Sequence, residues 1–458
     1  MTTSTRDKVI TPALVAMCLA YFMVILDNTI VNVALPALHT DLGASVTGLQ
    51  WVVDGYLLML AAGLLTGGTL ADRFGARAVF QIGLGVFVLA SVGCGVAPST
   101  VVLVIARLVQ GIGAALSVPA SLALLRAAFP DASARARAIG IWGGIAGLAA
   151  ATGPILGGVL VSAVSWRLVF FVNVPIGVAA MWLTAIHVPV MAGRAGRLDP
   201  AAQVVGVFTL AALAFALIEG GHNGLTTPVL VAGVVFVLAA VAFVLVERTV
   251  AEPMVPLDLF RVAEFSGGSI VGLLINLGFY GELFVLNLYF QQVLHLSALL
   301  AGIGLLPQMA VVAAGSALSG RFTARAGGPR ATMLIGLVVG GAGLFGLMLA
   351  QPGGGYPLLV LPLIAAGFGM SFTMPAATTA VVEAAPDGRA GLASGVVNAA
   401  RQVGGVIGIA LLGALVSGTG AVFVSGLRLA MVFAGAAFLL GALITMFTVG
   451  KSPSSSTG

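Results

Sequence analysis

Stretches of about 20 mostly apolar residues recur along the whole chain, separated by short polar segments. A helix needs roughly 20 apolar residues to cross the hydrocarbon core of a bilayer. Fourteen segments meet this requirement, near residues 12–35, 48–70, 78–97, 100–123, 137–163, 168–188, 201–219, 227–247, 266–291, 298–320, 331–350, 356–378, 391–416 and 427–449. Most contain Gly or Pro, which membrane helices tolerate. The pattern predicts an all-α integral membrane protein with fourteen transmembrane helices.

Composition supports this prediction and argues against other classes of protein. Hydrophobic residues make up 60% of the 458 residues and charged residues only 8%, whereas soluble globular proteins contain about 25% charged residues. The sequence has no GxxxxGK[ST] nucleotide-binding loop, and its four histidines lack the spacing of metal ligands. We therefore expect neither an enzyme nor a nucleotide, metal or cofactor site, so an ion gradient must supply the energy for any transport.

The basic residues lie mostly in alternate loops. With an internal N-terminus, 16 of the 20 fall on the inner side, namely Arg6, Lys8, Arg73, Arg77, Arg126, Arg135, Arg137, Arg194, Arg197, Arg248, Arg261, Arg321, Arg325, Arg330, Arg389 and Lys451. Arg167 and Arg428 fall near the outer surface, while Arg107 and Arg401 lie within predicted spans. This positive-inside pattern predicts a multi-pass protein of a bacterial cytoplasmic membrane with both termini in the cytoplasm. It accounts for the net charge of +5 without a nucleic-acid partner.

The two halves of the chain repeat. Gly111, Gly113, Pro119, Pro130 and Asp131 recur, each 256 positions later, as Gly367, Gly369, Pro375, Pro386 and Asp387. Removing residues 200–255 leaves six predicted spans on each side, in the same order and orientation. The repeat predicts a six-helix bundle over 1–199, two inserted transmembrane helices over 200–255, and a second six-helix bundle over 256–458. Parallel repeats place a substrate pathway between the bundles, near the middle of the bilayer.

Several motifs resemble those of a known family. They are GTLADRFGAR at 68–77, RLVQGIG at 107–113, GPILGG at 153–158, LDNTIVNVALP at 26–36, WRLVFFVNVP at 166–175 and EPMVPLDLF at 252–260. Together they resemble the signatures of the major facilitator superfamily, specifically its 14-span drug:proton antiporter branch, over nearly the whole chain. One departure is Ala76, where the family usually has a basic residue.

The resemblance implies a proton-coupled antiporter that exports amphipathic, often cationic or antibiotic-like compounds across the lipid bilayer by alternating access. One alternative is an exporter dedicated to a single metabolite or self-made antibiotic. A membrane receptor or scaffold without transport activity is a further alternative, although no hydrophilic segment exceeds roughly twenty residues, as a soluble interaction domain would require. The GPILGG motif disfavours an importer.

The segment at 68–77 is a candidate conformational latch. Gly68 and Gly75 permit a tight turn, and Asp72 can pair with Arg73, Arg77 and neighbouring helix ends. Such ion pairs would hold one conformation of the transport cycle and break in the other. The alternative is an ordinary polar turn with basic anchors.

Asp27 is the first candidate for proton coupling and substrate binding. It lies about sixteen residues into the first span, and Asn28 and Asn32 extend the polar strip on the same helix. A carboxylate at this depth costs about 2.5–3.5 kcal/mol and persists mainly where it faces a cavity. The alternative is a buried acid that a neighbouring helix neutralises. Arg107, seven residues into the inward-running fourth span, matches its depth and is the expected counter-charge, with Gln110 one turn away.

Two further acids lie within predicted spans, and their roles stay open. Asp54 lies near the outer end of the second span, where it is either solvated or functional. Glu282 falls opposite a candidate cavity face that comprises Asn276, Tyr280, Asn287 and Gln291. It therefore either pairs with a neighbouring helix or turns inward at a break near Gly278 or Gly281.

The remaining candidates are uncharged or lie in the second half. Asn398, Arg401 and Gln402 share one face of the thirteenth span and are expected to contribute donors to the cavity. The antiporter motif has no ionisable group, so its expected role is geometric. Gly153, Gly157 and Gly158, together with Gly144 and Gly147, permit close helix approach, and Pro154 kinks the helix.

Overall fold

The computed structural model describes residues 11–129, 131–190, 200–250, 255, 257–326, 328–386, 389–416 and 420–450. Over these residues the chain is helical apart from one isolated bridge between Gln351 and Gly354. Thirteen helices are long and apolar enough to span a membrane, or fourteen when one bent pair counts as a single span. The predicted all-α membrane fold is confirmed. Arg6, Lys8, Arg194, Arg197, Lys451, Pro130, Asp387 and most of 252–256 lie outside the described residues.

The first half contributes seven helices: α1 (Pro12–Leu42), α2 (Val46–Phe74), α3 (Ala76–Gly95), α4 (Thr100–Ala128), α5 (Ala132–Ala163), α6 (Leu168–Phe171) and α7 (Asn173–His187). Side-chain caps fix where four of them start, because Thr11, Ser45, Ser99 and Asp131 accept hydrogen bonds from backbone N–H groups of the first turn. The predicted span at 168–188 consists of two helices, α6 and α7, which together still cross the membrane.

Two helices are inserted between the halves, α8 (Pro200–Asn223) and α9 (Thr227–Thr249). They pack against each other, and α8 also contacts α2 and α15. Only 6% of the most apolar window of α9 is buried inside the protein. Because its mean hydropathy is 3.2, α9 faces lipid at the periphery.

The second half comprises η2 (Leu259–Arg261), α10 (Ala263–Leu288), η3 (Tyr289–Val293), α11 (Ala298–Gly304), α12 (Leu306–Arg325), α13 (Pro329–Gly346), η4 (Leu347–Leu349), α14 (Tyr356–Glu383), α15 (Ala390–Ala414) and α16 (Gly420–Thr448). The predicted span at 298–320 is bent, because α11 and α12, which together are long and apolar enough to cross the membrane, meet at an angle of 43°. Pro307 is the second residue of α12, and a proline there favours the start of a new helix over the continuation of α11.

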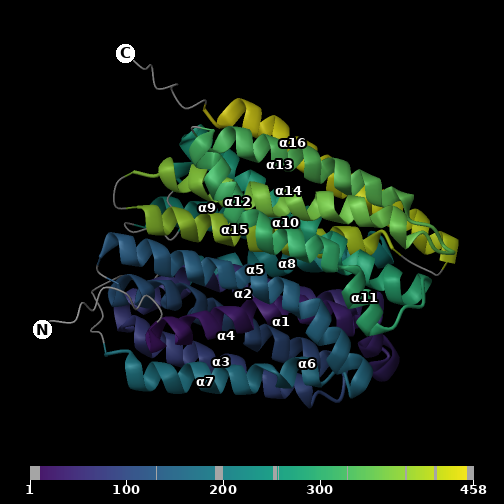
Figure 1. Ribbon diagram of the computed structural model, residues 1–458, viewed down its shortest axis with the longest axis horizontal. Coiled ribbons are helices and arrows are strands. Elements are labelled where there is room, and N and C mark those ends of the chain that lie inside the picture. The colour runs from purple at the N-terminus through teal and green to yellow at the C-terminus, as the bar shows by residue number, and fades with distance from the viewer. Residues whose placement is uncertain are drawn as a thin grey trace, which may run out of the picture.

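The helix contacts of the two halves follow the same pattern. In the first half α2 packs on α4, α1 on α5, and α3 on α4 and α7; in the second half α12 packs on α14, α10 on α15, and α13 on α14 and α16. Figure 1 shows the purple-to-blue helices of the first half lying beside the green-to-yellow helices of the second. The fold therefore contains two pseudo-symmetric six-span bundles with two inserted helices. The domain boundaries near residues 199 and 255 stay a prediction.

Three sets of contacts join the bundles: α2 with α15, α5 with α11 and α12, and α1 with α10 and α11. We call the end of the bundle where α2 ends and α3 begins the basic end, because Arg73, Arg77 and Arg126 lie there with most other described arginines. Arg167 and Arg428 lie toward the opposite end. Any site shared by both bundles must lie along these three helix contacts.

Candidate functional site

Asp27 and Arg107 form an ion pair inside the first bundle, between Asp27 Oδ2 and Arg107 Nη1, and both side chains are fully buried. Asp27 Oδ1 accepts hydrogen bonds from Gln110 Nε2 and Asn173 Nδ2, each 2.8 Å long. Arg107 Nε donates to the Val52 carbonyl at 2.9 Å. The pair therefore brings α1, α2, α4 and α7 together around one buried carboxylate.

Aromatic rings complete the environment of Arg107. Its guanidinium carbon lies 4.3 Å from the centroid of the Tyr56 ring and 5.9 Å from that of Phe170. Ser91 Oγ accepts a hydrogen bond from Gln110 Nε2 at 2.8 Å. A buried ion pair is stable only when further hydrogen bonds compensate for desolvation. This cluster supplies them to Asp27 and to Arg107 Nε and Nη1, while Arg107 Nη2 has no partner among the described residues. Protonation of Asp27 would remove the counter-charge of a guanidinium that is always charged.

The depth match between Asp27 and Arg107 corresponds to direct contact, and Asp27 in this conformation is a buried acid neutralised by a neighbouring helix, the predicted alternative to a carboxylate that faces a cavity. Its relative exposure is 0%, because Arg107, Gln110 and Asn173 enclose it. Sequence reasoning missed Asn173 and Ser91 as partners. Asn173 lies in the motif at 166–175, which marked this segment as characteristic of the family. An uncharged side chain at the start of a helix, however, does not identify its hydrogen-bond partner.

Asp54 is not solvated, contrary to one of the two predicted alternatives. Its side chain is fully buried, and neither carboxylate oxygen has a hydrogen-bond partner among the described residues. One turn earlier on α2, Gln50 Nε2 donates to the Ile409 and Ala410 carbonyls of α15 at 2.9 and 3.0 Å. Asp54 therefore occupies a helix face that meets the second bundle.

Glu282 pairs with a neighbouring helix, which is the first of its two predicted alternatives. Both of its carboxylate oxygens accept from Gln308 Nε2 of α12, at 3.0 and 2.9 Å. Helix α10 runs without a break through Gly278 and Gly281, so the second alternative is wrong. The side chain is 1% exposed and lies inside the second bundle.

Part of the predicted polar face of α10 contacts α1 across the two bundles. Asn28 Nδ2 donates to Tyr280 Oη at 3.1 Å, and Gln291 Nε2 donates to the Val33 carbonyl at 3.1 Å. Gln291 also donates to Asn287 Oδ1 at 2.7 Å. Two other predicted cavity residues donate within their own helices instead. Asn276 Nδ2 donates to the Gly272 carbonyl of α10, and Asn32 Nδ2 donates to the Asn28 carbonyl of α1.

A cavity of about 560 Å³ lies between the bundles. We call it the central cavity; its lining residues are Leu64, Leu65, Gly68, Thr69, Asp72, Val118, Pro119, Leu122, Ala123, Arg126, Trp142, Leu392, Ser394, Gly395 and Asn398. They come from α2, α4 and α5 of the first bundle and α15 of the second. Asp72 and Arg126 are exposed, so the cavity reaches the basic end.

An aromatic pair and an arginine lie beside the central cavity. Trp142 stacks on Tyr21 of α1 with ring centroids 3.8 Å apart, and Trp142 Nε1 is buried without a hydrogen-bond partner. Arg401 Nη1 donates to Oδ1 of the cavity-lining Asn398 at 3.0 Å. Gln402, the third residue predicted on this face, is half-buried, and its Oε1 has no partner among the described residues.

The GPILGG motif lies where the bundles meet at the opposite end. A Cβ atom on Gly158 would lie 2.6 Å from Leu299 Cα, and one on Gly157 would lie 2.9 Å from Ile30 Cγ1. Gly153 faces Thr29, and the Pro154 carbonyl faces Gly302 of α11. Leu299 N donates to Ser162 Oγ at 3.2 Å. Absent side chains thus allow α5 to approach α1 and α11 and to close this end.

Not every glycine of α5 takes part in this approach. Gly147 meets Ala313 of α12, since a Cβ atom there would lie 3.0 Å from Ala313 Cα. Gly144 has nothing within 4 Å of a Cβ position, so the expectation that it packs closely is wrong. Pro154 lies inside α5, which remains one continuous helix from Ala132 to Ala163.

The predicted interlocking ion pairs of segment 68–77 are not formed in this conformation. Asp72 is exposed and forms no ion pair with any residue that the structure describes. Arg77 Nη2 donates to the Ala185 carbonyl of α7 at 2.8 Å, and Arg73 lies over the Phe74 ring. Gly75 adopts φ 89°, as the tight turn requires. Asp72 lines the central cavity, which separates it from the second bundle.

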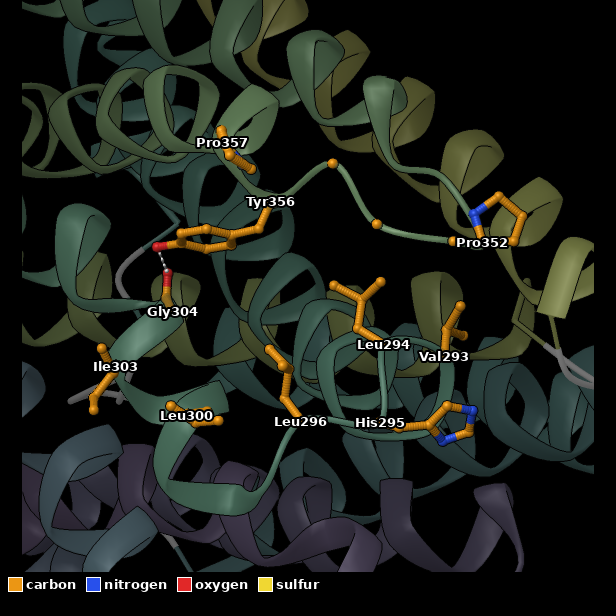
Figure 2. A pocket seen from close by; sticks show the side chains of 13 residues that line it. Val293, Leu294, His295, Leu296, Leu300, Ile303, Gly304, Pro352, Tyr356 and Pro357 are labelled. Atoms are coloured by element: carbon orange, nitrogen blue, oxygen red, sulfur yellow. Dashed lines mark hydrogen bonds between the residues drawn. The ribbon is translucent and has the colours of Figure 1, made fainter.

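A second cavity, of about 610 Å³, lies at the opposite end and belongs to the second bundle alone. Figure 2 shows Tyr356 reaching across it, and Tyr356 Oη donates to the Gly304 carbonyl at 3.0 Å. Its lining is mostly apolar, with His295 as its one ionisable side chain besides Tyr356. The first bundle contributes no described residue to the lining of this second cavity. Relative motion of the bundles would therefore open or close the central cavity but not the second one. Among the described residues, no group of three or more His, Cys, Asp or Glu side chains could hold a metal.

The sequence matches the profile of the Major Facilitator Superfamily over residues 17–409, with a second match over residues 308–458. A methylenomycin A resistance protein of Bacillus subtilis is 37% identical over 94% of this chain and 92% of its own length. A methylenomycin A resistance protein of Streptomyces coelicolor is also 37% identical, over 93% of this chain and 90% of its own length. The multidrug resistance protein Stp of Mycobacterium tuberculosis is 38% identical over 88% of this chain and 75% of its own length.

Solved transporter structures share the fold. A bacterial homologue of the human lysosomal transporter Spinster, in an inward-facing and unoccupied conformation, has a TM-score of 0.69 at 18% identity and covers 99% of this chain and 100% of its own. The xylose transporter of E. coli in an inward-open conformation has a TM-score of 0.67 at 17% identity, covering 98% of each chain.

Proposed function

The chain belongs to the Major Facilitator Superfamily, and on this basis we propose that it is a proton-coupled antiporter that exports amphipathic drugs or antibiotics by alternating access. One observation carries the proposal. The bundles enclose a cavity that reaches the basic end, while glycine-mediated packing of α5 on α1 and α11 closes the opposite end. A transporter caught between uptake and release of cargo needs this asymmetry.

The basic end faces the cytoplasm in this proposal, since positively charged residues concentrate on that side of membrane proteins. The protein then lies in a bacterial cytoplasmic membrane with its cargo site open to the cytoplasm. No nucleotide-binding loop occurs in the sequence, so a proton gradient drives export. One proton moving through 100 mV supplies about 2.3 kcal/mol before any contribution from pH.

Asp27 carries the proton in this scheme. In the structure its carboxylate is paired with Arg107, which is the arrangement of a deprotonated acid. A proton arriving from the opposite end would neutralise Asp27, break the ion pair and leave Arg107 without a counter-charge. Because an unpaired charge in the membrane is costly, the first bundle would then favour a rearranged state until the proton leaves.

Segment 68–77 acts as the latch of the other state in this proposal. When the cytoplasmic side closes, Asp72 approaches the second bundle, and the ion pairs that are absent here can form. This assignment explains why Asp72 lines the cavity unpaired in the present conformation.

The test is export of fluorescent dyes and antibiotics from energised everted vesicles that contain the protein. Export should collapse with an uncoupler and should be lost in Asp27→Asn. Asp258→Asn is a matched control, because Asp258 belongs to an exposed ion pair with Arg389 and should retain export. Uncoupler-resistant export, or normal export by Asp27→Asn, would contradict the proposal.

A second candidate is an exporter dedicated to one compound. Two of the relatives are named for resistance to a single antibiotic, methylenomycin A, whereas another is named for multidrug resistance. A panel of structurally unrelated compounds separates the two. Export of several of them supports the multidrug activity, and export of one class supports the dedicated activity.

A further inference from the structure

We infer that the central cavity selects amphipathic compounds that carry an acidic group, with Arg401 as the residue that binds their anionic end. This inference rests on the proposed function, because it names the class of cargo for that same cavity. It differs from the expectation of cationic cargo that the family resemblance suggests.

Arg401 is an arginine within a membrane span that has few partners among the described residues. It lies in the middle of α15, and its stem packs on α10, where a Cβ atom on Gly272 would lie 3.2 Å from Arg401 Cγ. Its one hydrogen bond among the described residues joins Nη1 to Asn398 Oδ1, and its Nε is buried without a partner. It forms no ion pair with any described carboxylate.

Arg107 provides the comparison within the same protein. Both arginines lie inside spans, but Arg107 is fully buried and paired with Asp27, whereas Arg401 is half-buried and donates to the cavity-lining Asn398. An arginine cannot lose its charge in a protein, and a charge at this depth persists mainly where it faces a partner or a water-filled cavity. An anionic ligand would supply the partner that Arg401 lacks.

The acids of the membrane region offer no site for a cationic ligand in this conformation. Asp27 and Asp54 are 0% exposed and Glu282 is 1% exposed, so a molecule in the central cavity touches none of them. Asp72 does line the cavity, but it lies at the basic end with Arg126 in the same lining. Asp72 and Arg126 therefore offset each other, whereas Arg401, which donates to the cavity-lining Asn398, faces no carboxylate among the described residues within ion-pair distance.

The rest of the site fits the apolar part of such a ligand. Trp142 stacks on Tyr21 and lines the cavity with Leu64, Leu65 and Leu122. Trp142 Nε1 is a buried donor without a partner, and indole N–H groups only donate. A flat or apolar ring would pack on these side chains, while its carboxylate or phenolate oxygens would accept from Arg401 and Trp142.

Binding of two xanthene dyes to the purified full-length protein in detergent tests the inference directly. Fluorescein is an anion, and a rhodamine methyl ester has the same ring system with a positive charge. Fluorescence polarisation should show that wild-type protein binds fluorescein at least tenfold more tightly than the ester. Arg401→Gln should weaken fluorescein binding at least tenfold, which corresponds to about 1.4 kcal/mol, and Arg401→Lys should restore most of it.

Arg428→Gln is the matched control, because Arg428 donates to the Ala350 carbonyl away from the cavity and should leave dye binding unchanged. Equal binding of fluorescein by wild type and Arg401→Gln would overturn the inference, as would tighter binding of the ester by wild type. The wild-type comparison of the two dyes decides the matter even if Arg401→Gln fails to fold.

Vesicle export separates this inference from the proposed function. Binding of fluorescein that depends on Arg401, without uncoupler-sensitive export of any compound, would uphold the anion site and refute the exporter. Uncoupler-sensitive export of the ester but not of fluorescein would uphold the exporter and refute the anion site.

Discussion

Replacing Asp27 by Asn should destabilise the protein strongly, and replacing Arg107 at the same time should restore much of the loss. The introduced amide would keep an oxygen to accept from Gln110 and Asn173, as Asp27 Oδ1 does at 2.8 Å. Its N–H₂ group, however, would face Arg107, which is itself only a donor. The variant leaves a fully buried guanidinium without a counter-charge.

The size of the effect follows from this geometry. Removing one partner of a buried ion pair costs about 3–5 kcal/mol, whereas replacing both partners together costs little in many proteins. Asp27→Asn should therefore lower the unfolding free energy by about 3–5 kcal/mol. The double variant Asp27→Asn, Arg107→Gln should recover most of that amount, because Gln carries no charge and its side chain can both donate and accept.

Thermal unfolding of the purified variants in detergent measures the stabilities, and the dye assay in everted vesicles measures transport. The double variant should be stable but unable to couple export to protons, which would assign the pair to coupling rather than to folding alone. A loss below about 1 kcal/mol in Asp27→Asn, or losses in the two single variants that simply add in the double variant, would refute the reasoning.

Three further predictions concern closure of the two ends. Gly158→Leu should abolish export, because a Cβ atom there would lie 2.6 Å from Leu299 Cα. Gly144→Leu should retain export, because nothing lies within 4 Å of a Cβ atom at that position. An equal loss of export in both variants would contradict closure of this end by the packing of α5 on α11. Gln50→Leu removes two hydrogen bonds to α15, each worth about 0.5–1.5 kcal/mol. Labelling of Val33→Cys by an impermeant maleimide should then become several-fold faster. An unchanged rate would argue against a role of these hydrogen bonds in holding the bundles together. Asp72→Asn should reduce dye export at least tenfold at normal abundance in the membrane, while normal export would exclude the latch.

The spans were predictable because bilayer thickness imposes one requirement on every transmembrane helix, and the sequence displays it directly. The pairing of Asp27 with Arg107 was predictable for a similar reason, since two opposite charges at equal depth in lipid each need a partner. Neutral polar residues gave no such signal. Asn173 begins α7 after a break in the predicted span, and nothing in its neighbours indicates that it bonds to Asp27.

Features that depend on distance between helices, or on the state of the cycle, could not be predicted. Gly144 and Gly158 look alike in sequence, yet one faces open space and the other packs on α11. The unpaired state of Asp72 belongs to a conformation in which the basic end is open. The enclosure of Asp27 and Asp54 depends on helices far away in the sequence, so their depth within a span could not show whether a cavity reaches them.

The proposed proton site lies within the first bundle, whereas the proposed cargo site lies between the bundles and includes Arg401 of the second, so coupling requires a contact between them. The Asp27 cluster belongs wholly to the first bundle, and Arg401 belongs to the second. Asn28, the residue after Asp27, donates to Tyr280 of α10, and successive residues of a helix point about 100° apart. Helix α1 therefore contacts Arg107 through one side chain and the second bundle through the next. A change in the charge of Asp27 that shifts or rotates α1 would alter the Asn28–Tyr280 contact between the bundles. A single helix can therefore link the proposed proton site to the second bundle without a longer chain of contacts.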